Sequence, residues 1–100
     1  MATYQSSNQT SEPPLLSIII PIYNEAELLQ EVLHRVRNIS YQPKELILID
    51  DYSEDGTRDI LKSESSKPST TILYHDRNRG KGAAIRTGLE HCFGEVVIIQ

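Results

Sequence analysis

The sequence predicts an α/β fold, a doubly wound and mostly parallel sheet with helices on both faces. Short aliphatic runs of strand length alternate with segments of helical pattern, so the predicted element order is βαβαβαβ. Each connection between consecutive strands is long enough to contain a helix, which favours parallel pairing and right-handed crossovers. The 100 residues include 38% hydrophobic and 24% charged residues, which is the balance of a single soluble globular domain.

The first half of the chain contains two predicted strands and one helix. Residues 15–20 form a continuous aliphatic run that suits a strand buried on both faces, and we expect Pro21 to end it because proline has no backbone N–H to donate. Residues 25–36 predict an amphipathic helix, since apolar residues recur at steps of three and four and acidic residues precede basic ones. Residues 45–49 predict a second buried strand that ends at an acidic pair.

The second half repeats the alternation. Residues 53–57 have turn chemistry and lead into a short predicted helix around residues 58–63. A β-branched and aromatic segment, residues 70–74, predicts the third strand. A glycine-containing loop then precedes a helix over residues 83–91, with Ile85 and Leu89 facing inward, and a fourth strand over residues 95–99.

Residues 1–14 are polar and predict a flexible arm, which leaves residues 15–100 as the folded part. A chain that stops on the last residue of a strand leaves its strand-end loop unfinished, so we expect a fragment of a longer protein.

Cys92 is the only cysteine and can form no internal disulfide, which suits a reducing compartment such as the cytoplasm. No apolar run approaches the roughly 20 residues that a membrane helix needs.

The charge balance disfavours one class of partner. Lys and Arg total 10 and Asp and Glu total 14, so the formal net charge is −4. This is the wrong sign for a domain that binds nucleic acid by neutralising phosphates. We therefore expect no nucleic acid partner.

In doubly wound sheets, ligands bind beyond the carboxyl ends of the strands, and these loops contain candidate binding residues. Tyr23 offers a ring that can stack on a base, with Asn24 and Glu25 beside it. Asp50 and Asp51 can accept hydrogen bonds from a base or ribose, or approach a cation. The alternatives are packing for the tyrosine, a helix-start carboxylate for the glutamate, and a solvated acidic turn for the aspartates.

The segment 76–86 contains four basic residues and one acidic residue, Asp76, directly before a predicted helix. A basic loop at a helix amino terminus suits a diphosphate or another anion, although a solvated loop is the alternative. The basic residues are Arg77, Arg79, Lys81 and Arg86. The histidines have no second metal-type ligand at helical spacing, so we assign surface or packing roles to His34, His75 and His91.

Two common phosphate-binding motifs and one signalling module do not fit. The turn after the first strand contains no glycine, which excludes the dinucleotide-binding pattern G-x-G-x-x-G. A P-loop requires Ser or Thr after its lysine, where this chain has Gly82. A phosphoacceptor receiver domain would need its acidic pair after the first strand, whereas here the pair follows the second.

Three segments together carry a family resemblance: LSIIIPIYNE, ELILIDDYSEDGT and HDRNRGKGAAIRTGLEHCFGEVVIIQ. They resemble the amino-terminal half of a family 2 glycosyltransferase, close to the dolichyl- or polyprenyl-phosphate sugar synthase branch. The resemblance implies a GT-A fold, which would be incomplete here. It also implies transfer of a sugar from a nucleoside diphosphate sugar with inversion at the anomeric carbon.

The resemblance also assigns roles by position. Pro21, Tyr23 and Glu25 would line the nucleoside pocket, Ile49 and Asp51 would meet the base and ribose, and Lys81 would lie near the phosphates. We keep Asn24 and Asp50 as further candidates from the strand-end loops. The family's Asp-x-Asp metal motif, which would bind Mg or Mn, is expected just after Gln100, as are the catalytic residues, so residues 1–100 alone are expected to be inactive.

The expected partners follow from the same resemblance. The donor would be a GDP- or UDP-sugar, and the acceptor a polyprenyl or dolichyl phosphate at the cytoplasmic face of a membrane. Two alternatives stay open: a glycosyltransferase that acts on a sugar hydroxyl, and a fragment that binds nucleotide without catalysis.

Overall fold

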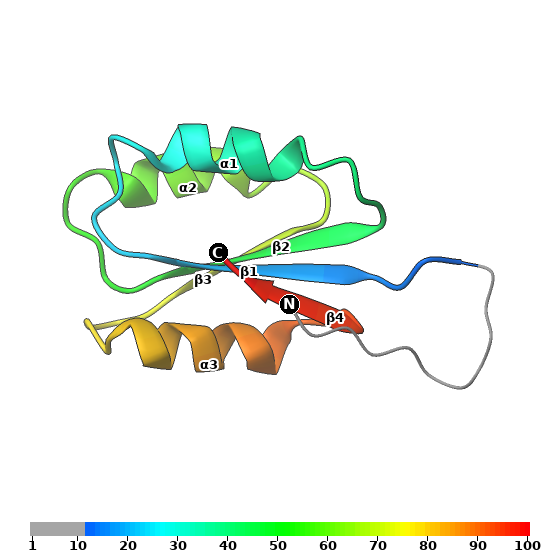
Figure 1. The fold of residues 1–100 in the computed structure, drawn as a ribbon. Helices are drawn as coiled ribbons and strands as arrows, with labels where there is room; N and C mark the ends of the chain where they lie inside the picture. Colours follow the sequence, from blue (N-terminus) through cyan, green and yellow to red (C-terminus); the bar gives the residue numbers. More distant parts are fainter. Residues whose placement is uncertain (1–11) are drawn as a thin grey trace.

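The computed structural model describes residues 12–100, in which strands and helices alternate along the chain (Figure 1). The elements are β1 (Leu16–Ile22), α1 (Leu29–Arg37), β2 (Lys44–Asp50), α2 (Thr57–Glu64), β3 (Thr70–Tyr74), α3 (Lys81–His91) and β4 (Val96–Ile99). The predicted βαβαβαβ order is therefore confirmed. Most of the predicted arm, residues 1–11, lies outside the described residues.

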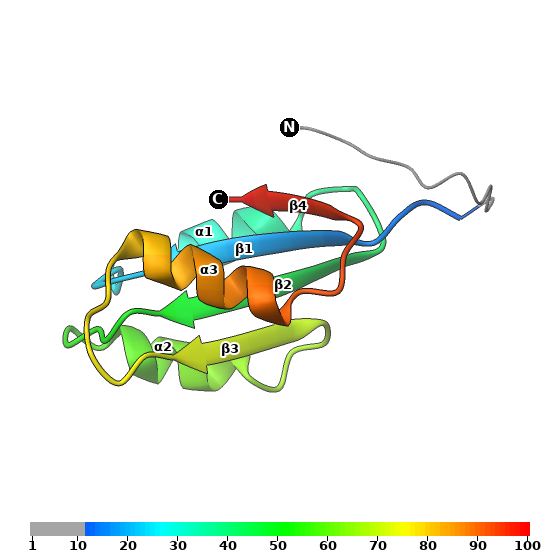
Figure 2. The same cartoon turned by 90° about the horizontal axis from the view of Figure 1, so that it is seen from below.

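The four strands form one parallel sheet in the order β3-β2-β1-β4. The register pairs Leu16 with Lys44 and Ile22 with Asp50 along β1 and β2, while β4 pairs only with the first four residues of β1. Helices α1 and α2 cover one face of the sheet and α3 covers the other (Figures 1 and 2). This is the predicted doubly wound α/β fold.

The hydrophobic core has two parts, one on each face of the sheet. Alternate residues of β1 supply the two parts: Ile18 and Ile20 pack with α1 and α2, and Ile19 packs on the opposite side with Ile49 and Ala84. Because successive side chains of a strand point to opposite faces, a strand covered on both sides must be apolar at every position. The aliphatic run of β1 is uninterrupted because helices cover the strand on both faces of the sheet.

Two predicted boundaries were wrong. Strand β1 continues through Pro21 to Ile22. The Ile19 carbonyl faces β4, because it accepts a hydrogen bond from the Gln100 amide. Every second residue of a strand directs its backbone groups to the same side, so the backbone nitrogen of Pro21 also faces the β4 side. Pro21 lies beyond the last residue of β1 that pairs with β4. A missing N–H is tolerated there because, among the described residues, the pairing of β1 with β4 ends at Ile19, while β2 pairs with Pro21 from the other side.

Helix α1 begins at Leu29, later than the predicted start at residue 25. Residues 25–28 form a turn in which the Glu25 carbonyl accepts hydrogen bonds from the Leu28 and Leu29 amides. The amides of Glu25 and Ala26 donate to side chains of the β2–α2 loop instead. Tertiary hydrogen bonds thus take the place of a first helical turn.

The inward face of α3 also differs from the prediction. Leu89 is 47% exposed, and the buried residues of the helix are Ala83, Ala84 and Gly88. A Cβ atom added to Gly88 would lie 2.6 Å from the Ile19 Cγ2 atom. Small residues therefore face the sheet because α3 lies close against β1 and β2 (Figure 2).

Candidate functional site

A pocket of about 320 Å³ lies beyond the carboxyl ends of β1 and β2, next to the first turn of α3. It is lined by Pro21, Ile22, Tyr23, Glu25, Asp51, Asn78, Gly80, Lys81 and Ala84. Five of the eight residues nominated from the sequence are among these, namely Pro21, Tyr23, Glu25, Asp51 and Lys81. The other three, Asn24, Ile49 and Asp50, lie outside the lining.

The pocket combines an aromatic ring with charges of both signs. The Tyr23 side chain lines the pocket and is about half exposed, so part of its aromatic surface is open to a ligand. Lys81 is the first residue of α3, that helix has no acidic residue in its first turn, and its cap residue has no side chain that could accept from the first amides. The cap residue, Gly80, has a φ of 95°, which favours glycine. The start of α3 therefore presents an ammonium group and the positive end of the helix dipole to an anion.

Asp51 is the buried carboxylate of the pocket, and it connects three parts of the chain. Its Oδ1 atom accepts a hydrogen bond from the Arg79 amide at 2.8 Å and lies 2.8 Å from His75 Nδ1. Its Oδ2 atom accepts from the Gly80 amide at 2.8 Å. Burial raises the pKa of Asp51, but the hydrogen bonds from Arg79, His75 and Gly80 outweigh it and hold the pKa below the ordinary 3.8. Asp51 is thus an ionised carboxylate that fixes the loop before α3.

Asp50 has different surroundings from its neighbour. Its side chain is fully buried, and its Oδ2 atom accepts hydrogen bonds from the Ser53 amide at 3.0 Å and from Arg58 Nε at 2.7 Å. The Arg58 guanidinium carbon lies 5.3 Å from the ring centroids of both Tyr52 and Tyr74. Asp50 therefore holds α2 and the aromatic side chains at the end of the sheet.

Four hydrogen bonds join the loop after β1 to the loop after β2, and we call this set the interloop bridge. Asn24 takes part twice: its amide donates to Ser53 Oγ at 2.8 Å, and its Oδ1 atom accepts from the Glu54 amide at 2.9 Å. The other two bonds run from the Glu25 amide to Thr57 Oγ1 and from the Ala26 amide to Asp55 Oδ2, at 3.0 and 3.1 Å. Asn24 is therefore placed to support the pocket wall that Tyr23 and Glu25 form.

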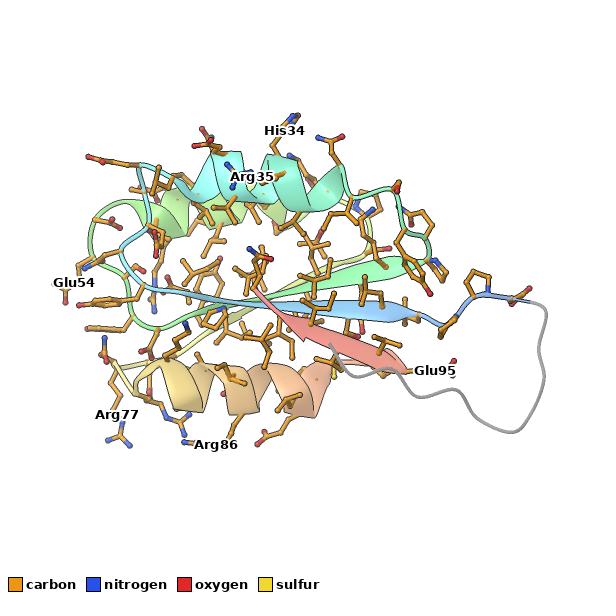
Figure 3. All side chains as sticks on the ribbon, viewed as in Figure 1. His34, Arg35, Glu54, Arg77, Arg86 and Glu95 are labelled. Carbon is orange, nitrogen blue, oxygen red and sulfur yellow. The ribbon has the colours of Figure 1, made fainter. Side chains whose placement is uncertain are left out.

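Of the four basic residues predicted around a phosphate, only Lys81 lines the pocket. Figure 3 shows Arg77, from the β3–α3 loop, and Glu54, from the β2–α2 loop, at the same end of the sheet. Arg86 lies on the outer side of α3 in the same view, and the side chains of Arg77 and Arg86 both point away from the sheet. Arg77, Arg79 and Arg86 are exposed.

Two residues of this region were not predicted from the sequence. Asn78 lines the pocket, and nothing in its spacing indicated it. His75 is buried, which agrees with the packing alternative for this residue, but its ring also lies against Asp51, a contact that the sequence did not predict. The strand register contained the signal: Asp50 pairs with Tyr74, so the next residue on each strand, Asp51 and His75, must also be neighbours.

The described residues do not by themselves form a metal centre or a membrane span. Within residues 12–100 no group of three or more His, Cys, Asp or Glu side chains is arranged to bind a metal ion. No helix in the same range combines the length and the apolar character required to cross a bilayer.

A family model described as glycosyl transferase family 2 matches residues 17–100, nearly the whole of the folded part. The chain belongs to this family. The resemblance seen in the sequence motifs is thus confirmed, and the strand order and helix positions are those of its GT-A fold.

Individual curated proteins are similar over most of this chain. It is 39% identical over 92 residues to the glycosyltransferase AglE of Haloferax volcanii, covering 88% of this chain and 30% of AglE. It is 38% identical over 89 residues to an undecaprenyl-phosphate 4-deoxy-4-formamido-L-arabinose transferase of Pseudomonas fluorescens, covering 83% of this chain and 26% of that protein. The chain therefore spans less than a third of the length of these two relatives.

Solved structures of other proteins have a similar fold over most of this chain. The mannosyltransferase PcManGT from Pyrobaculum calidifontis, in complex with GDP-Man and Mn²⁺, superposes with a TM-score of 0.78 at 30% identity, covering 87% of this chain and 27% of that one. S. aureus TarS in complex with UDP superposes with a TM-score of 0.78 at 25% identity, covering 85% of this chain and 26% of that one. The described residues thus correspond to about a quarter of each structure.

Proposed function

We propose that the protein containing this chain transfers a sugar from a nucleoside diphosphate sugar to an acceptor, and that residues 15–100 supply the amino-terminal part of its donor site. The observation that carries the proposal is the pocket beyond β1 and β2, which combines the exposed Tyr23 ring, the Asp51 carboxylate and Lys81 at the start of α3. A stacking surface, a hydrogen-bond acceptor and an anion-binding helix end are the features that a nucleoside diphosphate needs.

Each pocket residue then has a distinct task. The base stacks on Tyr23 between Pro21 and Glu25, and the free acceptor capacity of Asp51 meets the base or ribose. Lys81 and the amides at the start of α3 neutralise the diphosphate, which stabilises the nucleotide as a leaving group. Asn24, Ile49 and Asp50 act from outside the lining by holding the loops and the strand end in place.

We further propose that a divalent cation, Mg or Mn, takes part. The support comes from the similar mannosyltransferase, whose structure contains GDP-Man and Mn²⁺. The side chains of residues 12–100 do not form a site for such an ion. We therefore place its ligands outside this chain, in the Asp-x-Asp segment that the family resemblance expects after Gln100.

For the acceptor we propose a polyprenyl or dolichyl phosphate, met at the cytoplasmic face of a membrane and glycosylated with inversion. Several similar proteins are named as undecaprenyl-phosphate sugar transferases, which supports this choice. An acceptor phosphate is already anionic at neutral pH, so its attack requires positioning and charge neutralisation more than a strong base. A sugar hydroxyl acceptor would instead require a carboxylate base.

The test uses the full-length protein with radiolabelled UDP- and GDP-sugars, Mn²⁺, and either polyprenyl phosphate or the corresponding polyprenol. We expect a lipid-linked sugar product with the phosphate only, and inverted anomeric configuration by NMR. Transfer to a sugar hydroxyl and not to the lipid phosphate would overturn the proposed acceptor. Donor binding without turnover of any donor would overturn the proposed catalysis and leave a nucleotide-binding module.

A further inference from the structure

His75 is a buried residue that lies outside the pocket but contacts one of its walls. It follows β3 directly, and its side chain is only 5% exposed. Its amide donates to the Asp50 carbonyl at 2.8 Å, and its carbonyl accepts from Arg58 Nη2 at 2.7 Å. The backbone of His75 is therefore fixed on both sides, which sets the position from which its buried ring extends.

The ring joins the end of β2 to α3. Its Nδ1 atom lies 2.8 Å from Asp51 Oδ1, and its Nε2 atom lies 2.9 Å from the Thr87 hydroxyl. Thr87 sits in the middle of α3, where its hydroxyl can donate to the Ala83 carbonyl at 3.0 Å. One side chain thus spans the space between the strand end and the helix.

Counting protons identifies which ring nitrogen is the donor. An ionised carboxylate can only accept, so Nδ1 must carry the proton that lies between His75 and Asp51. The Thr87 hydroxyl has a single proton. If the hydroxyl donates this proton to the Ala83 carbonyl, Nε2 must donate to the hydroxyl oxygen, and the ring carries protons on both nitrogens. If the hydroxyl donates to Nε2, the ring carries a proton on Nδ1 alone. In both arrangements Nδ1–H donates to Asp51.

Asp51 passes this constraint on to the pocket. The same Oδ1 atom that meets His75 also accepts from the Arg79 amide, and Oδ2 accepts from the Gly80 amide. A carboxylate has about four acceptor positions, so three are occupied and about one is left for a ligand. The direction of that free position depends on the rotamer of Asp51. The His75 ring holds this rotamer from the side of the carboxylate that faces away from the pocket.

We infer that His75 is a positioning residue of the donor site: its Nδ1–H orients the Asp51 carboxylate, and through it the loop that carries Asn78, Gly80 and Lys81 into the pocket. Thr87 holds the ring in the required orientation. The inference rests on the proposed function, because it concerns the residues that would receive a nucleoside diphosphate. His75 itself is not among the residues that line the pocket.

Two polar substitutions separate orientation of Asp51 from simple space filling. In His75→Asn the amide can occupy the position of Nδ1 and keep the bond to Asp51, while the bond to Thr87 is lost. In His75→Gln the amide reaches the position of Nε2, and the bond to Asp51 is lost. Glutamine is closer to histidine in length, so a space-filling role would favour His75→Gln. His34, exposed on the outer side of α1 (Figure 3), provides matched controls as His34→Asn and His34→Gln.

The first measurement is amide hydrogen exchange of Arg79 and Gly80 in the full-length protein without ligand. We expect exchange in His75→Gln to be faster than in the wild type by about tenfold, the factor that about 1.4 kcal/mol of lost protection produces. His75→Asn should stay within about threefold of the wild type, and both His34 variants should match it. Equal exchange in His75→Asn and His75→Gln, or slower exchange in His75→Gln, would overturn the inference.

The second measurement is the Kd for UDP and GDP by calorimetry. His75→Gln should weaken binding about tenfold and His75→Asn much less, in the same order as the exchange rates. Equal affinities of the wild type and His75→Gln would overturn the link between His75 and the donor site. If the wild type bound neither nucleotide, the proposed function would fail, while the exchange experiment would still decide whether His75 orients Asp51.

Discussion

Asp50 and Asp51 are neighbours in the sequence, but their carboxylates lie on opposite faces of the sheet. Asp50 meets Arg58 of α2 on one face, whereas Asp51 meets His75 and the loop before α3 on the other. Successive residues of an extended strand point in opposite directions, and the end of β2 keeps this alternation. The acidic pair is therefore two separate sites, and substitutions at the two positions should have different effects.

Replacing Asp51 with alanine in the full-length protein should weaken nucleoside diphosphate binding by about 1–3 kcal/mol. The substitution removes the acceptor for the Arg79 and Gly80 amides and for the ligand. Calorimetry with a set of nucleoside diphosphates measures the effect. Unchanged affinity for every nucleotide that the wild type binds would show that Asp51 supports the fold alone.

Replacing Asp50 with alanine should instead lower the free energy of unfolding, by about 2–3 kcal/mol. The Arg58 guanidinium and the Ser53 amide would lose a buried acceptor. Urea unfolding measures the loss, and calorimetry at a temperature where the variant is folded should show a smaller change in nucleotide affinity than Asp51→Ala gives. The reverse order of effects would contradict these assignments.

Lys81→Gln should reduce the affinity for a nucleoside diphosphate more than the affinity for the corresponding nucleoside. A point charge acts on the phosphates and not on the base, and its effect should shrink as added salt screens it. Titrations of both ligands at two salt concentrations provide the measurement. Equal losses for both ligands, together with a lower melting temperature without ligand, would mean that the lysine acts on the fold.

Gly88→Ala tests the close approach of α3 to the sheet. The new Cβ would lie 2.6 Å from Ile19 Cγ2 and 2.9 Å from Ile49 Cδ1, so overpacking should destabilise the protein by about 1–3 kcal/mol. Gly82→Ala is the control in the same helix, because its nearest neighbour is Arg86 Nη1 at 3.5 Å and alanine is the better helix former. Thermal unfolding in which both variants lose equal stability would argue against tight packing at Gly88.

The pKa of Asp51 predicts how stability responds to acid. A carboxyl with a lower pKa in the folded than in the unfolded protein stabilises the fold above its unfolded pKa, and this contribution is lost as the pH falls through the folded pKa. We therefore expect the free energy of unfolding of the wild type to decrease more steeply below pH 3.8 than that of Asp51→Asn. Urea unfolding of both proteins between about pH 5 and about pH 2 measures this difference. If the free energies of unfolding of the two proteins fell in parallel with pH, the lowered pKa would be contradicted.

The strands, their order along the chain and the family were predictable, because aliphatic runs and ordered motifs are local signals. The inward face of α3 was not, because a prediction from apolar periodicity selects Leu89, whereas the close contact with Ile19 requires Ala84 and Gly88. The start of α1 was missed for a related reason: amides that would begin the helix donate to another loop.

Some residues of the candidate site were likewise predictable from the sequence, and others were not. Pro21, Tyr23, Glu25, Asp51 and Lys81 all reach the pocket, because strand-end loops of a parallel sheet converge at one edge. The roles of Asp50 and His75 depend on which face a side chain takes and which strands are adjacent. Those facts follow from the register and cannot be read from residue type or spacing along one segment.

The interloop bridge determines which parts of the pocket are free to move. Two independent loops would each lose conformational freedom when a ligand ordered them, whereas loops already joined to each other have lost it during folding. The wall that carries Tyr23 and Glu25 is thus preorganised, while residues 76–80 are joined to the end of β2 chiefly through one carboxylate. If the pocket receives the proposed donor, the Tyr23 and Glu25 wall would recognise the nucleoside rigidly, and residues 76–80 would supply any adaptation to the rest of the donor.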